Sequence, residues 1–243
     1  MKAITISAYG DVDQLHEEEL DIPQIANDEV LVKIKATSIN PIDWKARMGF
    51  LKQMYDWQFP VVLGWDLSGI ITQVGKDVKH FKVGDEVFAR PDIYEDGTKG
   101  TYAEYAAVKE DKLALKPSNV SFEAAAAIPL AGLTAWQVIV DRLKVKKGDK
   151  VLIQAGAGGV GIFAIQIAKH LGAYVATTAS AKNIEFLTNL GADEVIDYHE
   201  HQIGEVLKQY DAVFDTVDDL EAGLAILKPT GKLVTIAGRP TQA

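Results

Sequence analysis

The sequence predicts an α/β protein in two parts, a β-rich first part and a second part with a doubly wound parallel sheet. Three observations predict this. Short segments that alternate apolar and polar residues fill the first half, as half-buried strands do. Beyond Ser121, apolar runs without strict alternation are separated by helical segments, which indicates a parallel sheet covered on both faces. A glycine-rich turn joins one of these runs to its helix. We expect parts at residues 1–125 and 126–243.

The composition and charge of the chain exclude several kinds of partner and binding site. The 243 residues are 48% hydrophobic and 24% charged, which is ordinary for a globular chain. A net charge of −9 argues against a nucleic-acid or membrane-surface partner. The absence of cysteine excludes disulfides and thiolate metal sites. The first residues do not resemble a signal peptide, and no apolar run reaches membrane-spanning length. We therefore expect a cytoplasmic protein.

In the first part, one short helix interrupts the strands. Asn40 suits its N-cap, Pro41 its first position, Asp43 its acidic first turn and Gly49 its end. The expected strands cover residues 2–7, 29–39, 67–74, 86–90 and 101–108.

In the second part, strands and helices alternate after two helical stretches at 123–127 and 129–143. The expected strands cover residues 151–155, 174–179, 194–197, 212–217 and 232–237. The expected helices between them cover residues 160–171, 183–190, 202–209 and 220–227.

The glycine-rich turn has the spacing of a dinucleotide-binding site. Gly156, Gly158 and Gly161 form G-x-G-x-x-G between an apolar strand and a helix with apolar residues at helical spacing. We expect Gly156 to allow a sharp turn, Gly158 to let the backbone approach a diphosphate, and Gly161 to let helix and strand pack closely. A glycine-rich turn without a ligand is the alternative, and the flanking strand and helix argue against it.

The end of the second strand indicates which dinucleotide binds. A site for NAD usually has an acidic residue there, to accept hydrogen bonds from the ribose hydroxyls. Here the first acid is Glu185, whereas Ser180 and Lys182 offer a hydroxyl and a cation to a 2′-phosphate. The sequence therefore favours NADPH. The alternative is that Ser180 is a helix N-cap and Lys182 is solvated.

Several motifs in order resemble the zinc-independent medium-chain dehydrogenase/reductases, in particular the NADPH:quinone oxidoreductase (zeta-crystallin-like) group. They are NPIDWKARMG (40–49), LGWDLSG (63–69), VGDEVFA (83–89), TYAEYA (101–106), IPLAGLTAW (128–136) and AGAGGVG (155–161). The resemblance implies a GroES-like substrate domain and a Rossmann NADPH-binding domain, with the active site between them. It also implies reduction of quinones or related conjugated carbonyls, and we expect a homodimer.

The resemblance also implies roles for particular residues. Lys182 and Tyr198 would flank the 2′-phosphate beside Ser180, and Thr134 would lie next to the nicotinamide. The strand end under the nicotinamide ring would be Ala237 and Gly238. The remaining expected cofactor contacts are Gly159, Val160, Thr178 and Val217.

Three residues of the first part are candidates for the substrate pocket. Asn40 and Asp43 match the polar pair of the family's pocket, although capping of the helix at Pro41 explains them equally well. Tyr55 could stack on a flat substrate, although an aromatic stretch more often serves packing. With Thr134, these are the expected catalytic residues.

No metal is expected. The positions that hold catalytic zinc in zinc-dependent relatives are Asn40, Trp65 and Leu130, which are not zinc ligands. The segment 91–101 has no cysteine, and the sequence suggests no third ligand beside His199 and His201, which we interpret as a solvated pair.

Two departures from the family leave other functions open. Asp218 and Asp219 follow Val217, where the family often has glycines, and could disturb the approach of the cofactor. The chain ends at Ala243, short of its relatives, so we expect a chain truncated at its C-terminus with the strand at 232–237 as a bare edge. The alternatives to a quinone reductase are an enone or 2-alkenal reductase and a non-catalytic NADPH-binding regulatory or structural protein.

Overall fold

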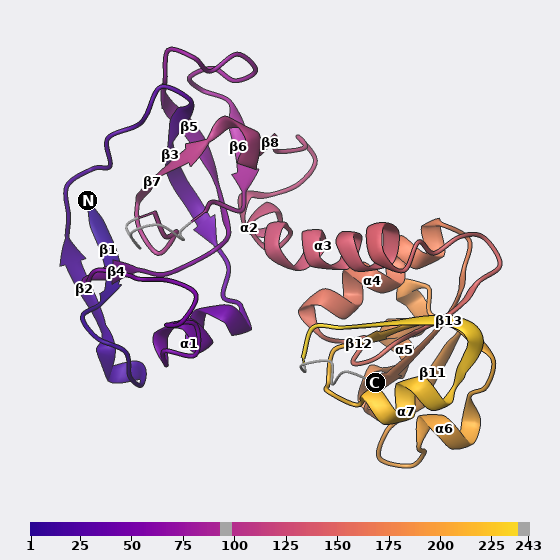
Figure 1. Ribbon diagram of the computed structural model, residues 1–243. Coiled ribbons are helices and arrows are strands. Elements are labelled where there is room, and N and C mark those ends of the chain that lie inside the picture. The colour runs from indigo at the N-terminus through magenta and orange to yellow at the C-terminus, as the bar shows by residue number, and fades with distance from the viewer. Residues whose placement is uncertain (93–98, 238–243) are drawn as a thin grey trace. The chain divides into compact units, whose positions relative to one another are not determined.

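The computed structural model describes residues 1–92 and 99–237 and divides into two compact units, residues 1–130 and 131–243 (Figure 1). The division falls inside helix α3 (Pro129–Trp136), a little beyond the boundary expected after residue 125. A domain boundary after residue 125 stays a prediction.

The first unit contains a five-stranded antiparallel sheet in the order β7-β3-β5-β6-β8. Its apolar core includes Val30, Val32, Leu67, Ile71 and Val87, which come from alternating positions of the strands. The strands are β3 (Glu29–Thr37), β5 (Leu67–Val74), β6 (Glu86–Ala89), β7 (Tyr105–Lys109) and β8 (Leu113–Leu115).

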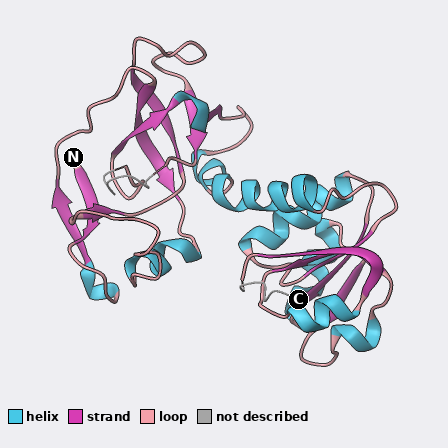
Figure 2. Cartoon of the chain, in the orientation of Figure 1, coloured by secondary structure: helices cyan, strands magenta, loops and turns pink. Residues whose placement is uncertain are grey.

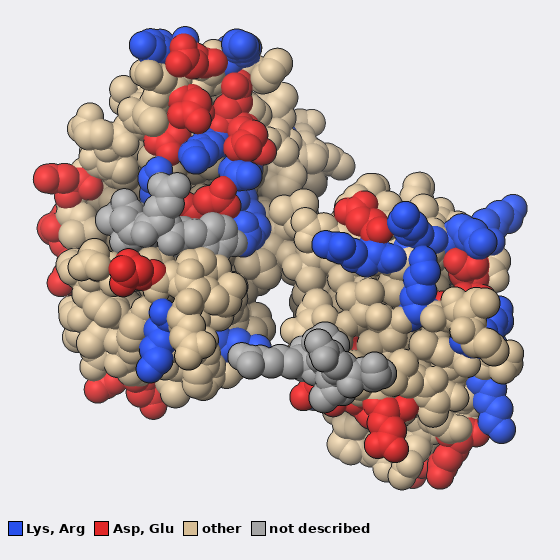
Figure 3. All heavy atoms as spheres, viewed as in Figure 1, with Lys and Arg blue, Asp and Glu red and all other residues tan. Residues whose placement is uncertain are grey.

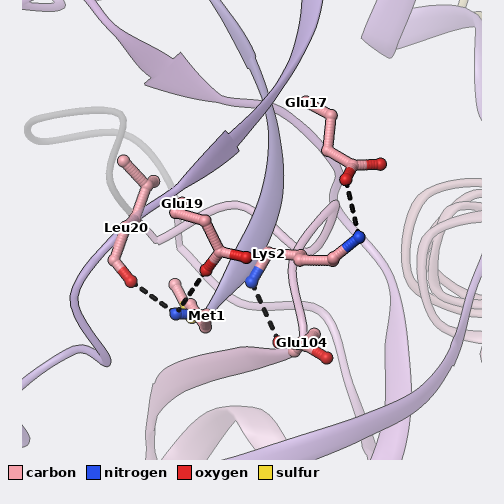
Figure 4. Close-up of polar contacts among 6 residues, drawn as sticks. All are labelled: Met1, Lys2, Glu17, Glu19, Leu20 and Glu104. Carbon is pink, nitrogen blue, oxygen red and sulfur yellow. Dashed lines mark hydrogen bonds and ion pairs between the residues drawn. The ribbon is translucent and has the colours of Figure 1, made fainter.

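A second, three-stranded sheet joins β1 (Lys2–Ile6) to β2 (Leu15–Glu19) and β4 (Val61–Val62). The Lys2 side chain pairs with Glu17 at 2.8 Å, and its backbone N–H donates to Glu104 at 2.9 Å (Figure 4). The Met1 amino group lies 3.5 Å from Glu19. Glu17 and Glu19 lie in strand β2, which the sequence did not predict, because consecutive glutamates are unusual in strands. The strands β4 and β8 were also missed, since two or three residues are too few to show the alternation of a strand.

The helices of the first unit are short. Helix α1 (Pro41–Arg47) packs against an aromatic core that contains Trp57 and Trp65. Helix α2 (Phe122–Ala126) begins at Ser121, whose side chain accepts a hydrogen bond from Ala124 N–H. Two 3₁₀ turns cover Val12–Gln14 and Glu110–Lys112.

The second unit has a parallel sheet in the order β11-β10-β9-β12-β13. Its strands are drawn in magenta in Figure 2. Alternate residues of β9 face opposite sides: Val151 and Ile153 belong to one apolar cluster and Leu152 to the other. Both faces of the sheet are therefore covered, as predicted. The strands are β9 (Lys150–Ile153), β10 (Tyr174–Ala179), β11 (Glu194–Asp197), β12 (Tyr210–Asp215) and β13 (Leu227–Thr235).

Helices α4 (Gly159–His170) and α5 (Ile184–Leu190) pack on one face, and α6 (Ile203–Val206) and α7 (Leu220–Ala225) on the other. The stretch expected as one helix at 129–143 changes from the α-helix α3 to a π-helix at Gln137–Arg142. A 3₁₀ turn at Ala181–Asn183 precedes α5.

Two element boundaries differ most from expectation. Helix α6 is one turn long rather than eight residues, because the chain soon turns into β12 through Gln209, which has a φ of 61°. Strand β13 begins at Leu227 although it contains Pro229. It has one strand neighbour among the described residues, and a proline without an N–H is tolerated on such an edge.

The surface carries both signs of charge. On the visible face of each unit, Lys and Arg side chains are interspersed with Asp and Glu (Figure 3). No helix among residues 1–92 and 99–237 is long and apolar enough to cross a bilayer.

Candidate functional site

The turn between β9 and α4 has the predicted glycines, but its sharp bend lies elsewhere. Ala155 has a φ of 50°, in the left-handed region, so the bend that we assigned to Gly156 is made by Ala155. Gly156 is required by packing instead, because a Cβ there would overlap the Thr177 hydroxyl and lie 2.9 Å from Ile165.

The other two glycines lie as expected around the first turn of α4. A Cβ on Gly161 would lie 2.5 Å from the Ala155 carbonyl oxygen and 2.7 Å from that of Gly156, so glycine allows the close packing of helix and turn. Gly158 is the N-cap and brings no capping side chain. A Cβ on Gly159 would meet no atom within 4 Å. The first-turn N–H groups of α4 therefore face a space that no side chain of these glycines fills, which suits an anion.

Side-chain hydroxyls fix the neighbouring strand ends. Thr178 Oγ1 accepts a hydrogen bond from Ala155 N–H at 2.9 Å, which ties the turn to the end of β10. Thr216 Oγ1 donates to the Gln154 carbonyl oxygen at 2.8 Å. The Asp215 carboxylate accepts from Val217 N–H at 2.9 Å. The carboxyl ends of β9, β10 and β12 are thus joined to one another.

A cavity of about 810 Å³ lies at this end of the sheet. Of the predicted cofactor residues, Thr178, Tyr198 and Val217 line it. Gln154 and His201 also line it and were not predicted, although both follow strands of the sheet. Since the carboxyl ends of parallel strands meet at one edge, their position after a strand is the signal that could have found them.

The two residues expected at the 2′-phosphate lie at the surface after β10. Ser180 is half-buried and makes no capping hydrogen bond with its side chain, which disfavours the alternative that it serves as an N-cap. Lys182 is exposed. Tyr198 is 57% exposed, and its ring lies 4.3 Å from that of His199. Binding of a phosphate by these residues stays a prediction.

A polar cluster is buried in the first unit at the start of α1. Asn40 Nδ2 donates to Asp66 Oδ2 at 2.8 Å, and Ser38 Oγ donates to the same oxygen at 2.5 Å. The other carboxylate oxygen of Asp66 accepts from Leu130 N–H at 2.7 Å. Asp66 is completely buried. Asp66 was not among the predicted residues, although an acid inside the apolar run 61–71 is unusual.

Asp43 caps the same helix. Its Oδ2 accepts from Asn40 N–H at 2.5 Å, and Asn40 and Asp43 form a capping box at the start of α1. The capping alternative therefore describes both residues, and the Asn40 amide nitrogen also donates to Asp66.

Burial raises the pKa of Asp43 to about 6, against hydrogen bonds from Asn40 N–H and the Tyr102 hydroxyl, which favour the charged form. Burial likewise raises the pKa of Asp66, and the donors from Ser38, Asn40 and Leu130 oppose it. The Tyr102 hydroxyl has its pKa raised by burial and by the adjacent Asp43 carboxylate. The cluster thus contains two carboxyl groups that hold protons more tightly than exposed ones do.

The pKa of Asp43 predicts how stability depends on pH. The folded state binds this proton more tightly than the unfolded state. We therefore expect the wild type to lose stability relative to Asp43→Asn as the pH rises from 4 to 6. The difference between 3.8 and about 6, at about 1.4 kcal/mol per pH unit, gives a loss on the order of 3 kcal/mol. Above pH 6 the difference should be constant. Urea unfolding of both proteins at each pH measures it; parallel curves would contradict the raised pKa.

Comparison with known proteins identifies the family. Residues 26–118 match the alcohol dehydrogenase GroES-like domain, and residues 159–243 match the zinc-binding dehydrogenase domain. A quinone-oxidoreductase homolog of spinach chloroplasts (Spinacia oleracea) is 36% identical over 99% of this chain and 76% of its own length. The chain belongs to the quinone oxidoreductase group of the medium-chain dehydrogenase/reductases.

Further relatives of this medium-chain dehydrogenase/reductase extend the comparison. A chloroplastic NADPH-dependent alkenal/one oxidoreductase of Arabidopsis thaliana is 42% identical over 99% of the chain, which spans 64% of that relative's length. The structure of a quinone oxidoreductase from Coxiella burnetii matches with a TM-score of 0.88 and 39% identity, over 97% of this chain and 75% of that one.

The two aspartates after Val217, where the family often has glycines, have local structural roles. Asp218 has a φ of 66°, in the left-handed region that glycine usually occupies and that aspartate tolerates better than most residues. Asp219 accepts a hydrogen bond from Ala222 N–H at 3.4 Å and caps α7. Both acids therefore have structural uses, and only Asp219 lines the cavity.

Several other predicted residues are not among those that line the cavity. Tyr55 stacks on Trp57 with ring centroids 5.3 Å apart, as its packing alternative proposes. Thr134 is half-buried in α3. Val160 lies in the first turn of α4. Ala237 is exposed beyond β13, and Gly238 lies outside the described residues. The functional roles expected of these residues stay predictions.

Zinc-dependent members of the family bind their metal through clustered ligands. In the part of the chain that the structure describes, no three or more His, Cys, Asp or Glu residues are grouped so as to hold a metal ion. The segment 93–98, within the region where a structural zinc lobe was considered, lies outside the described residues.

Proposed function

We propose that this chain carries the NADPH site and substrate-pocket residues of an oxidoreductase that transfers hydride to quinones or related conjugated carbonyls. The observation that carries the proposal is the open N-terminus of α4. Ala155, in the turn that leads to it, lines the 810 Å³ cavity. The names of the relatives support both the cofactor and the two substrate classes. The chain spans 64% of the length of the Arabidopsis relative, and the activity is therefore a proposal for this chain.

The residues present fit NADPH. First-turn N–H groups of α4, at Gly159, Val160 and Gly161, would hold the diphosphate. No acid follows β10 that would repel a 2′-phosphate, and Ser180, Lys182 and Tyr198 would surround it. Thr178 and Val217 would contact the adenosine side, and Thr134, Ala237 and Gly238 the nicotinamide. The bound cofactor would supply the hydride.

The chain's own task would be to position the reactants and exclude water. Reacting atoms must be held about 3–3.5 Å apart, and preorganised donors then stabilise the charge that develops on the acceptor oxygen. We assign substrate positioning to Asn40 and Thr134, with Asp43 holding the start of α1 on which Asn40 depends. No proton transfer by a side chain is required for the hydride step.

A titration tests the cofactor proposal. Cofactor fluorescence should show that NADPH binds at least tenfold more tightly than NADH, a difference of about 1.4 kcal/mol. Equal affinities would contradict the roles of Ser180 and Lys182, and absence of binding would contradict the site as a whole.

A substrate panel separates the proposed activities. NADPH oxidation should be faster with para-quinones than with 2-alkenals if the chain serves a quinone reductase, and the reverse order would favour an enone reductase. Tight NADPH binding without turnover of any electrophile would instead favour a regulatory or structural role.

Independence from zinc is part of the proposal. Asn40, Trp65 and Leu130 occupy the positions that we align with catalytic zinc ligands, and they are poor ligands. Turnover should survive dialysis against EDTA, with less than about 0.1 zinc per chain by elemental analysis; loss of turnover restored by zinc would contradict it. A homodimer and a cytoplasmic location stay predictions, and light scattering tests the first.

A further inference from the structure

The side-chain amide of Gln154 lies in the wall of the cavity without a partner for its oxygen. Gln154 is 2% exposed and lines the cavity. Its backbone is paired, since its N–H donates to the Phe214 carbonyl oxygen at 3.0 Å and its carbonyl oxygen accepts from Thr216 Oγ1 at 2.8 Å. The side-chain oxygen is buried and accepts no hydrogen bond from the described residues. A buried polar group without a partner is destabilising, which indicates a partner from outside the chain.

The alternation of β9 directs the Gln154 side chain toward the face of the sheet that α6 and α7 cover. Leu152, two residues earlier, belongs to the apolar cluster that contains Ile203, and Ala222 packs against the same cluster. Residues two apart along a strand face the same side of the sheet. Ile203 and Ala222 also line the cavity. Gln154 therefore introduces a buried amide among apolar neighbours that a leucine would match better.

The charges around the cavity favour an uncharged ligand group. Glu205, Asp219 and Glu221 line it, whereas no lysine or arginine of the described residues does. Since like charges repel, these carboxylates disfavour a phosphate inside the cavity. Lys182, expected at the 2′-phosphate, is not among the lining residues. The cavity is therefore suited to a part of the ligand that carries no charge.

Within the proposed function, that part is the adenine base. Thr178 and Tyr198, which we placed on the adenosine side, line the cavity, whereas Thr134 and Ala237, which we placed at the nicotinamide, do not. Adenine is flat, and the Tyr198 ring and the Val217 side chain offer apolar surface to its faces. At its edge, adenine has an exocyclic amino group, which is a donor, beside a nitrogen of the five-membered ring, which is an acceptor.

We propose that Gln154 is a specificity-determining residue whose amide pairs with this edge of adenine. The amide oxygen accepts from the exocyclic amino group, and the amide nitrogen donates to the neighbouring ring nitrogen. This rests on the proposed function, because the base is that of NADPH. Glutamine and adenine pair in the same way where proteins read DNA. No hydrogen bond from the described residues holds the Gln154 amide, so its terminal torsion, which has broad minima, can turn toward the base.

The pairing is tested by binding rather than by turnover. Calorimetry measures Kd for NADPH and for its ethenoadenine analogue, in which a fused ring removes both amino hydrogens. The preference for NADPH over the analogue is compared between the wild type and Gln154→Leu, because the bulk of the fused ring affects both proteins. We expect this preference to be at least about tenfold larger in the wild type, as one such pair supplies. Equal preferences would overturn the proposal and leave the amide to a bound water.

Gln202→Leu is the matched control, because it removes an exposed glutamine amide from the same cavity. It should keep the wild-type preference, and a fall as large as that in Gln154→Leu would contradict a specific role of Gln154. We expect Gln154→Leu to fold, since leucine suits the apolar neighbours and removes the unpaired amide. If it does not fold, the hypoxanthine analogue of NADPH, with an oxygen in place of the amino group, is compared with NADPH on the wild type. At least about tenfold weaker binding of this analogue would support the proposal, and equal binding would overturn it.

The two proposals fail in different ways. If the wild type does not bind NADPH, the proposed cofactor site and the role of Gln154 both fail. If NADPH binds and Gln154→Leu keeps the wild-type preference, the role of Gln154 fails and the proposed function stands.

Discussion

Replacing Gly161 with alanine is expected to destabilise the second unit by about 1–3 kcal/mol, the usual range for an overpacked site. The added methyl group would lie 2.5 Å from the Ala155 carbonyl oxygen and 2.7 Å from that of Gly156. Both atoms belong to the backbone of the turn and cannot move aside as a flexible side chain would. Thermal unfolding followed by circular dichroism should show a fall of several degrees in the midpoint.

Gly159→Ala is the matched control, because it adds the same methyl group to the same helical turn. No atom lies within 4 Å of the added carbon, so packing is unaffected. Alanine has a better helix propensity than glycine, and we expect a stability change between zero and a gain of about 1 kcal/mol. NADPH affinity should nevertheless fall in Gly159→Ala if the diphosphate occupies that space. Equal stabilities of the two variants would contradict the packing role of Gly161.

Replacing Lys182 with glutamate is expected to reverse most of the preference for NADPH over NADH. The substitution changes the charge by two beside the expected 2′-phosphate, and a carboxylate there suits the ribose hydroxyls of NADH instead. A tenfold preference should fall to about one or below. Titration of each cofactor, monitored by fluorescence, measures the ratio.

Lys232→Glu is the control for this charge change, because Lys232 is another exposed lysine of the second unit and lies in β13. Its effect on the ratio of affinities should be small. Because Lys182 is exposed, added salt should weaken the wild-type preference for NADPH. An unchanged ratio in Lys182→Glu would remove this residue from the cofactor site, whatever the control shows.

Features whose cause is local could be predicted from the sequence. Alternation within β3 and β5 and the helical spacing after Gly161 depend on neighbouring residues, and the structure confirms these elements. The parallel sheet followed from apolar runs separated by helices. Strand β2 was missed, because its glutamates are unfavourable in strands and are accommodated only by partners such as Lys2 on β1.

Features that depend on distant residues could not be predicted. The bend at Ala155 required knowledge of backbone angles, since glycine was the better candidate by its chemistry. The π-helix after α3 has no pattern of its own in the apolar residues. Tyr55 could have faced a ligand or a neighbour, and only the position of Trp57 shows that it stacks in the aromatic core.

The sequence by itself determined the alternation of strands and helices, the glycine spacing and the absence of an acid after β10, because each of these depends on residues close together in the chain. Only the tertiary structure revealed that Asp66 receives donors from Ser38, Asn40 and Leu130. These residues come from segments far apart in sequence, and a buried carboxylate is stable only where such segments converge to supply its hydrogen bonds.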